Sequence, residues 1–292
     1  MMKKTKGEIA FQFADVFFLL IVFCAILFPL MYVLSVSVSS SAALRAGKVT
    51  IFPQGFNLGA YREILKNQAF LRSLVNTVGI TVVGTVLAVL VTAMAGCALT
   101  LDCYGKKFIT YFLVLTMYFS GGLVPTYIVY SRYLGLRNTY WVLFLPSLFS
   151  MFYAIVIRSQ IESMPKSVFE AAYVDGANEF RTLFSVTLPM IAPTIAAVSM
   201  FFALAKWNMW YNVMIYASSE KYWTLQYFLR VVVFDKFLAA NDSTQFIDSA
   251  DAIPEENYRM AAIVLAAAPI VAIYPFVQKY FVKGIVSGAV KG

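Results

Sequence analysis

Few side chains in this sequence have the chemistry of a catalytic or metal-binding group. Histidine is absent, which excludes histidine-based acid–base catalysis, a Ser-His-Asp triad, an HExxH zinc site and haem ligation by histidine. The apolar runs hold no pair of carboxylates, and the sequence has no phosphate loop of the G-x-x-x-x-G-K type. Cys24, Cys97 and Cys103 are too few and too scattered for a disulfide framework or a thiolate metal site. We therefore expect no catalytic residue, no metal site and no cofactor bound by this chain.

A polar stretch at residues 170–193 separates two long apolar segments and reads EAAYVDGANEFRTLFSVTLPMIAP. Just before it, Ser167 and Glu170 have the S-x-x-E spacing of a capping box, which predicts a helix that starts at Ser167. Ala171 and Ala172 leave the first turn of that helix nearly bare of side chain. Another protein surface can therefore approach its backbone closely.

The same stretch predicts a bend between two short helices. Gly176 tolerates backbone angles that other residues avoid, and Asp175 beside it can cap the second helix. Leu188 and Pro189 stand where the next helix begins, a place that tolerates the missing N–H of proline. The sequence therefore predicts a helix–bend–helix unit that leads into an apolar span.

A second group of polar and aromatic residues lies in an apolar segment around Lys206. An ionisable side chain within a membrane span is a functional-site hypothesis, because leaving its charge in lipid is costly. In a continuous helix, Trp207 and Tyr211 share one face. Asn208 and Asn212 share another, so stacking surfaces lie beside amide groups, which suits a sugar. One interpretation is a substrate path formed by Lys206, Trp207, Asn208, Trp210, Tyr211 and Asn212. The other is an interfacial aromatic belt with Lys206 reaching the outer headgroups, and both stay open here.

Membrane spans are the elements that must position these residues. The chain is 61% hydrophobic and 13% charged, against about 45–50% apolar residues in a soluble domain. An apolar run of about 20 residues is long enough to cross a bilayer as a helix. The sequence predicts an all-α, polytopic membrane protein with about six transmembrane helices, at about residues 16–36, 71–99, 108–130, 140–157, 191–216 and 260–282. Basic residues that flank the spans explain the formal charge of +8, so we expect no nucleic-acid partner.

Two of the predicted spans have unusual sequences. One face of the second span is a continuous stripe of small residues at four-residue steps, Gly84, Ala88, Thr92 and Gly96. The stripe predicts close helix contact, either within the chain or with another subunit. The third span contains Ser-Gly-Gly at residues 120–122 and then Pro125, which predicts a broken helix that faces protein or water rather than lipid.

The predicted external segments, about residues 37–70 and 217–257, carry opposite charges. Basic residues are frequent in the first external segment with the start of the span after it, and in the short external loop between the third and fourth predicted spans. They favour an anionic ligand: Arg45, Lys48, Arg62, Lys66, Arg72, Arg132 and Arg137. The segment at 217–257 contradicts this preference with its acids, Asp235, Asp242, Asp248, Asp251, Glu255 and Glu256. The charge of the solute stays open on these grounds.

The residues EAA, followed by Asp-Gly-Ala and later by Leu-Pro, resemble the EAA loop of binding-protein-dependent ABC importer permeases. The stretch SGGLVPTYIVYSRYLGLRNTYWVLFLP and the ending QKYFVKGIVSGAVKG resemble sugar permeases of the maltose-type, MalG-like class, LplC/YtcP-like branch. The resemblance implies the type I ABC importer permease fold, with residues 1–292 as one transmembrane domain. It also implies a cytoplasmic coupling loop, about residues 165–190, that inserts into a groove on the ATPase. The positions concerned are Glu170, Ala171, Ala172, Asp175, Gly176, Ala177, Leu188 and Pro189.

The same resemblance implies a set of partners and a location. The partners are a second permease that completes a heterodimer, two ATPase subunits that use ATP and Mg, an extracytoplasmic solute-binding protein and membrane lipid. The expected location is the bacterial cell membrane, as a multi-pass protein with both termini cytoplasmic. Lysines near the span ends, such as Lys106, Lys107 and Lys279, agree with this orientation.

The function implied is the import of an oligosaccharide without catalysis by this chain, and the implied solutes include oligomers that derive from a polysaccharide or contain uronate. A permease for another solute, such as a peptide or an amino acid, stays open as the alternative. A secondary transporter is disfavoured, because beyond Lys206 the sequence shows neither inverted repeats nor charged midplane sites.

Overall fold

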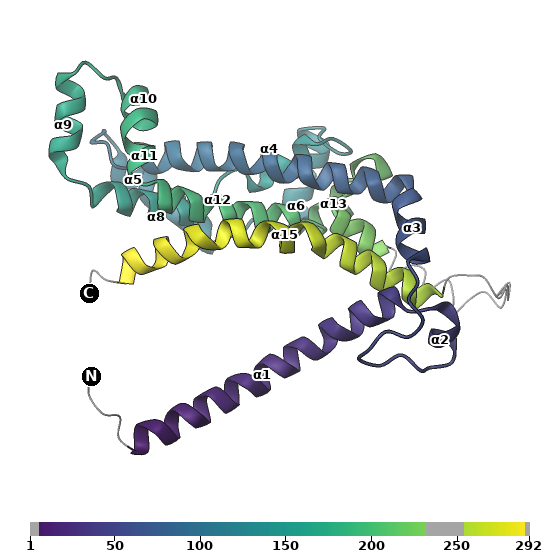
Figure 1. Ribbon diagram of the computed structural model, residues 1–292. Helices are drawn as coiled ribbons and strands as arrows, with labels where there is room; N and C mark the ends of the chain where they lie inside the picture. Colours follow the sequence, from purple (N-terminus) through teal and green to yellow (C-terminus); the bar gives the residue numbers. More distant parts are fainter. Residues whose placement is uncertain (1–5, 232–253, 290–292) are drawn as a thin grey trace. The chain divides into compact units, whose positions relative to one another are not determined.

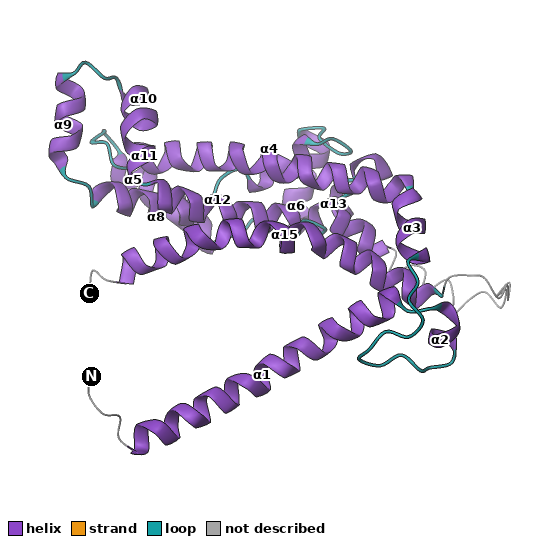
Figure 2. Ribbon diagram, in the orientation of Figure 1, coloured by secondary structure: helices purple, strands orange, loops and turns teal. Residues whose placement is uncertain are grey.

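The computed structural model describes residues 6–231 and 254–289, and this part of the chain contains helices and no strand (Figure 2). The predicted all-α class is therefore confirmed. Within the described residues, three helices are long and apolar enough to cross a membrane, and up to six spans result if each bent helix pair counts as one. The chain divides into two compact units, which are described separately below.

The first unit comprises Met1–Gln68 and Val231–Pro269. Its helices are α1 (Lys6–Val38), α2 (Ser41–Arg45), α3 (Gly59–Lys66) and the first part of α15 (Glu255–Ala289). The buried amide of Asn257 donates hydrogen bonds to the carbonyl oxygens of Val36, at 2.6 Å, and Ser39, at 3.3 Å. The Tyr61 hydroxyl donates to the Ser37 hydroxyl at 2.7 Å, so α3 and α15 both hold the end of α1.

The second unit comprises Ala69–Arg230 and Ile270–Gly292. Its helices up to the polar stretch are α4 (Gln68–Ala98), α5 (Lys106–Tyr118), α6 (Leu123–Ile128), the π-helix η1 (Val129–Tyr133), α7 (Trp141–Phe144), the 3₁₀ turn η2 (Leu145–Ser147) and α8 (Met151–Glu162). The later ones are α9 (Lys166–Val174), α10 (Glu179–Thr182), the π-helix η3 (Leu183–Thr187), α11 (Leu188–Met190), α12 (Ala192–Trp207), α13 (Tyr211–Tyr216) and the 3₁₀ turn η4 (Glu220–Tyr222). A further helix occupies residues 225–231.

Helix α4 packs its small-residue stripe inside this unit. Gly84, Ala88, Thr92 and Gly96 are all buried. A Cβ atom at Gly96 would lie 2.9 Å from Cγ2 of Ile157 and 3.0 Å from the carbonyl oxygen of Ala154, both in α8. The predicted close contact is therefore confirmed, and at these positions it is made within the chain.

In the part of the chain that the structure describes, three helix pairs are bent by more than 40° at short breaks. The predicted break in the third span is confirmed, since α5 and α6–η1 meet at 111° around residues 119–122. These residues are exposed in this chain, so its own side chains do not provide the cover that was expected for them.

The fourth and fifth predicted spans are not single continuous helices. The fourth, at 140–157, is divided into α7–η2 and α8, which meet at 52°. The fifth, at 191–216, ends as a helix at Trp207 and resumes at Tyr211. A further bend, of 88°, lies at the end of the polar stretch, where α10–α11 meets α12. Four acids of the predicted external segment at 217–257 lie outside the described residues: Asp235, Asp242, Asp248 and Asp251.

Candidate functional site

The predicted helix–bend–helix unit is present as α9 and α10, which stand side by side at the end of α4 and α8 (Figure 1). Helix α9 ends at Val174, and Gly176 has a φ of +74°, in the left-handed region that favours glycine. The Gly176 N–H donates to the Tyr173 carbonyl at 3.0 Å, and the Ala177 N–H donates to the Ala172 carbonyl at 2.9 Å. These two bonds form a Schellman motif, which closes the helix and fixes the direction of the bend.

Asn178 and Tyr173 fix the second half of this unit, called the α9–α10 hairpin below. The Asn178 side chain accepts from the Arg181 N–H at 2.8 Å and caps α10. The Tyr173 hydroxyl donates to Glu179 Oε1 at 2.8 Å, which links α9 to α10. That hydrogen bond to Glu179 raises the pKa of Tyr173, because it favours the neutral phenol, so the bond persists at neutral pH and is lost only as pH rises through the raised pKa.

Two capping predictions were wrong. Helix α9 begins at Lys166 with Pro165 as its N-cap and without a side-chain cap, so Ser167 lies inside the helix and forms no capping box. Asp175 is the C-cap of α9 rather than the N-cap of α10. The extra residues between bend and second helix give the capping position to Asn178. The prediction for Pro189 is confirmed, because Pro189 lies at the start of α11. Pro193 has the same place at the start of α12.

The outer surface of the hairpin is apolar as well as polar. Glu170 and Ala171 are exposed, whereas Ala172 is buried against the rest of the unit. Val174 is 87% exposed and Phe180 is 65% exposed. Exposed apolar side chains beside an alanine-lined helix are typical of a surface that binds another protein.

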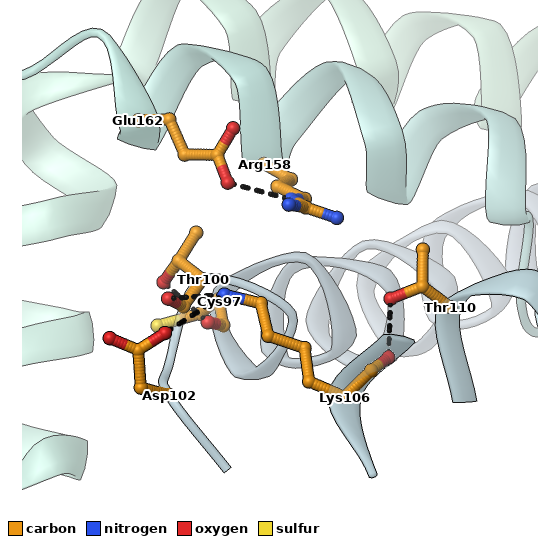
Figure 3. A network of polar contacts seen from close by, with 7 residues as sticks. All are labelled: Cys97, Thr100, Asp102, Lys106, Thr110, Arg158 and Glu162. Atoms are coloured by element: carbon orange, nitrogen blue, oxygen red, sulfur yellow. Dashed lines mark hydrogen bonds and ion pairs between the residues drawn. The ribbon is translucent and has the colours of Figure 1, made fainter. Parts of the chain in front are cut away.

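A pocket of about 430 Å³ lies beneath the hairpin. It is lined by residues from α4, α8, α9 and α10, among them Cys97, Glu162, Phe169 and Glu179. Next to it, polar contacts connect the end of α4 to the start of α5 (Figure 3). Lys106 Nζ donates to the Thr100 carbonyl at 3.1 Å and forms an ion pair with Asp102 at 3.5 Å. In α8, Arg158 Nε donates to Glu162 at 2.8 Å, so the base that carries the hairpin is itself held by polar contacts (Figure 3).

Lys206 is directed into the protein, not towards its surface. Its side chain is 1% exposed, and its ammonium donates to the Ser147 hydroxyl at 2.7 Å and, more weakly, to the Ser147 carbonyl at 3.4 Å. Its alkyl chain crosses α4 at Gly84, where a Cβ atom would lie 2.5 Å from the lysine Cδ. The sequence did not indicate Ser147; Pro146 beside it was the one local signal of an irregular backbone.

The residues around Lys206 form a second pocket, of about 220 Å³. Five of the six residues predicted for the substrate path line it: Lys206, Asn208, Trp210, Tyr211 and Asn212. Trp207 does not, because the helix ends there and its ring is buried elsewhere. Trp207 and Tyr211 therefore do not share one face of a continuous helix, contrary to the prediction from the sequence. The break at residues 208–210, not the helical period, brings these side chains to one place.

Two proteins of Bacillus subtilis (strain 168) are similar to this chain over nearly its whole length. The Bacillus subtilis (strain 168) protein LplC is 34% identical over 292 residues, which are 100% of this chain and 98% of that protein. The polygalacturonan/rhamnogalacturonan transport system permease protein YtcP of the same organism is 33% identical, over 94% of this chain and 96% of that protein.

A solved structure and a family model also match nearly the whole chain. A chain in the crystal structure of a bacterial ABC transporter involved in the import of the acidic polysaccharide alginate is 28% identical, with a TM-score of 0.87 over 96% of this chain and 100% of that one. The predicted importer permease fold is thereby confirmed. The family model matches residues 9–287. This chain belongs to the family described as binding-protein-dependent transport system inner membrane component.

Proposed function

We propose that this chain is a permease subunit of an ATP-driven importer of oligosaccharides. The observation that carries the proposal is the full-length likeness, at 33% identity, to a permease named for polygalacturonan and rhamnogalacturonan transport. The likeness to a chain of the alginate importer, at 28% identity, supports the same solute class. Peptide and amino-acid import receive no comparable support from these relatives.

The α9–α10 hairpin is the part that couples this chain to an ATPase. Its exposed surface, formed by Glu170, Ala171, Val174 and Phe180, suits a groove on a partner protein. The Schellman bond pair keeps the two helices at a fixed angle, so a push on the hairpin moves it as one body. Helices α8 and α12 follow that movement, because they flank the hairpin in the chain and pack against each other through the rings of Tyr153 and Phe202, whose centres are 4.9 Å apart.

The ATPase subunits, which bind ATP and Mg, supply all the chemistry of the cycle. This chain supplies movement and a path: closure of two ATPase subunits displaces the hairpin, and the spans alternate the path between outside and inside. A second, similar permease completes the membrane part, and a solute-binding protein delivers the sugar from outside. This arrangement places the hairpin and both termini in the cytoplasm.

The pocket at Lys206 belongs to the path in this proposal. Irregular backbone at membrane depth persists only where protein or a watery cavity surrounds it. The break before α8 and the break after α12 both border this pocket, through Ser147 and Asn208. Its lining joins aromatic rings to amide groups, which suits the faces and hydroxyls of a sugar ring.

The test is uptake by proteoliposomes that contain the complete complex with its binding protein. Labelled oligogalacturonides, alginate oligomers, maltodextrins, oligopeptides and amino acids are compared with and without ATP. We expect one of the oligosaccharides to accumulate only when ATP and the binding protein are both present. ATP-dependent uptake of a peptide or an amino acid, with none of any oligosaccharide, would contradict the proposal.

A further inference from the structure

Among the residues that the structure describes, none forms an ion pair with Lys206. An ammonium has three donors, and the contacts seen here, both to Ser147, are to neutral oxygens. Burying a cation with only neutral partners costs free energy. A lysine at this position therefore needs an explanation beyond packing.

Support of the broken helix does not by itself require a charge. Ser147 ends η2 just before the break that leads into α8, and the ammonium contacts both its hydroxyl and its carbonyl. A neutral donor would satisfy the same oxygens without the cost of burying a cation. Gly84 leaves room for the Cδ and Cε atoms of Lys206, so α4 and α12 together bring the ammonium to this point.

The pocket beside the ammonium has the size and lining of a subsite for one sugar ring. Its volume of about 220 Å³ is below the roughly 300–1,000 Å³ of pockets for drug-sized ligands. The amides of Asn208 and Asn212 and the ring of Tyr211 line it together with Lys206. A second cation lies close by, because the Arg230 guanidinium sits 4.1 Å from the ring centre of Trp210.

We propose that Lys206 binds the carboxylate of a uronate residue while an acidic oligosaccharide crosses the membrane, and so selects acidic over neutral sugars. This inference rests on the proposed function and names a specificity-determining residue within it. The carboxylate supplies the missing negative charge. It also accepts a hydrogen bond from an ammonium N–H that Ser147 does not use. The Asn208 and Asn212 amides meet the ring hydroxyls of the same residue.

The experiment separates charge from size. Uptake of an oligogalacturonide by the reconstituted complex is compared with uptake of the same oligomer after methyl esterification, which removes the charges and keeps the sugar chain. The variant Lys206→Met keeps an unbranched side chain against Gly84 and removes the ammonium. Ser147→Ala keeps the ammonium and removes its hydroxyl partner. The binding protein is the same throughout, so a change in the acid-to-ester ratio belongs to this chain.

In Lys206→Met we expect the KM for the acid to rise about tenfold or more and the KM for the ester to change by less than about threefold. Ser147→Ala should alter both substrates by the same factor. Equal losses for acid and ester in Lys206→Met would overturn the inference and leave Lys206 as a support for the broken helix. Failure of the unmodified complex to import any oligosaccharide would instead refute the proposed function.

A second variant keeps the inference testable if Lys206→Met does not assemble. Asn212→Asp retains Lys206 and places a competing carboxylate in the pocket. We expect it to slow uptake of the acid at least about tenfold more than uptake of the ester. An equal effect on both, or faster uptake of the acid, would overturn the assignment of the carboxylate to this pocket.

Discussion

At the scale of single residues, two glycines are needed for different physical reasons. Gly176 has a left-handed backbone, and nothing lies within 4 Å of the place where its Cβ would be. Gly84 has ordinary helical angles, but a Cβ there would meet the buried stem of Lys206 at 2.5 Å. The first glycine is therefore a requirement of backbone conformation, and the second a requirement of space.

We predict that Gly84→Ala destabilises the protein by about 1–3 kcal/mol, because the methyl group displaces the lysine stem and weakens its bonds to Ser147. Thermal unfolding of the purified complex measures this loss. Gly79→Ala is the matched control in the same helix, since nothing lies within 4 Å of that position. The double variant Gly84→Ala/Lys206→Ala should lose less than the sum of its two single variants. Equal unfolding temperatures for Gly84→Ala and Gly79→Ala would refute the close contact.

Residue patterns in the sequence revealed some of these roles and missed others. Gly176 and the stripe on α4 were predictable, because left-handed turns and close helix contacts each select small residues. The capping box predicted at Ser167 is absent, because Pro165 begins the helix earlier and leaves Ser167 within its first turn. The Lys206–Ser147 contact joins residues 59 positions apart, and no local pattern reports such a pair.

At the scale of elements, the hairpin and the broken spans carry the proposed mechanism. Gly121, Gly122 and Pro125 predicted the break between α5 and α6. The break after α12 has no glycine or proline, and its stability comes from tertiary contact: the Thr224 hydroxyl donates to the Met209 carbonyl in the gap. Breaks of this kind cannot be predicted from local propensity, because distant side chains satisfy the freed backbone groups.

Gly176→Ala tests the hairpin as an element. A side chain in the left-handed region costs roughly 1–2 kcal/mol, which favours other angles between α9 and α10. We expect ATP-driven uptake to fall several-fold while the amount of protein in the membrane stays the same. Gly47→Ala is the control, because Gly47 has a φ of +62° and equally open space but lies far from the hairpin in sequence. Similar losses of uptake in both variants would show that the bend at Gly176 has no special role.

At the scale of the whole molecule, charge outside the spans distinguishes substrates only weakly. Arg132 and Arg137 are exposed on η1 and the loop that follows it. Exposed charges act over about 8–10 Å at physiological salt, so their effect depends on ionic strength. A buried cation such as Lys206 is screened much less, which is why the proposed selectivity is assigned there.

Replacing Arg132 and Arg137 with Gln should therefore slow uptake of a uronate oligomer more than uptake of a neutral glycan at low salt. The difference should narrow as salt is raised, because screening removes long-range attraction first. Initial uptake rates at two salt concentrations provide the measurement. If both substrates slow equally at low salt, the external arginines do not attract the solute.

ATP hydrolysis and sugar uptake, measured together in the same proteoliposomes, test the central claim most directly. The comparison is between the unmodified complex and Glu170→Ala, a change on the exposed face of α9 that touches no span. We predict that binding-protein-stimulated ATP hydrolysis and uptake of the oligosaccharide are both lost, while the complex stays in the membrane. Normal stimulated hydrolysis together with normal uptake in Glu170→Ala would contradict the assignment of coupling to the α9–α10 hairpin.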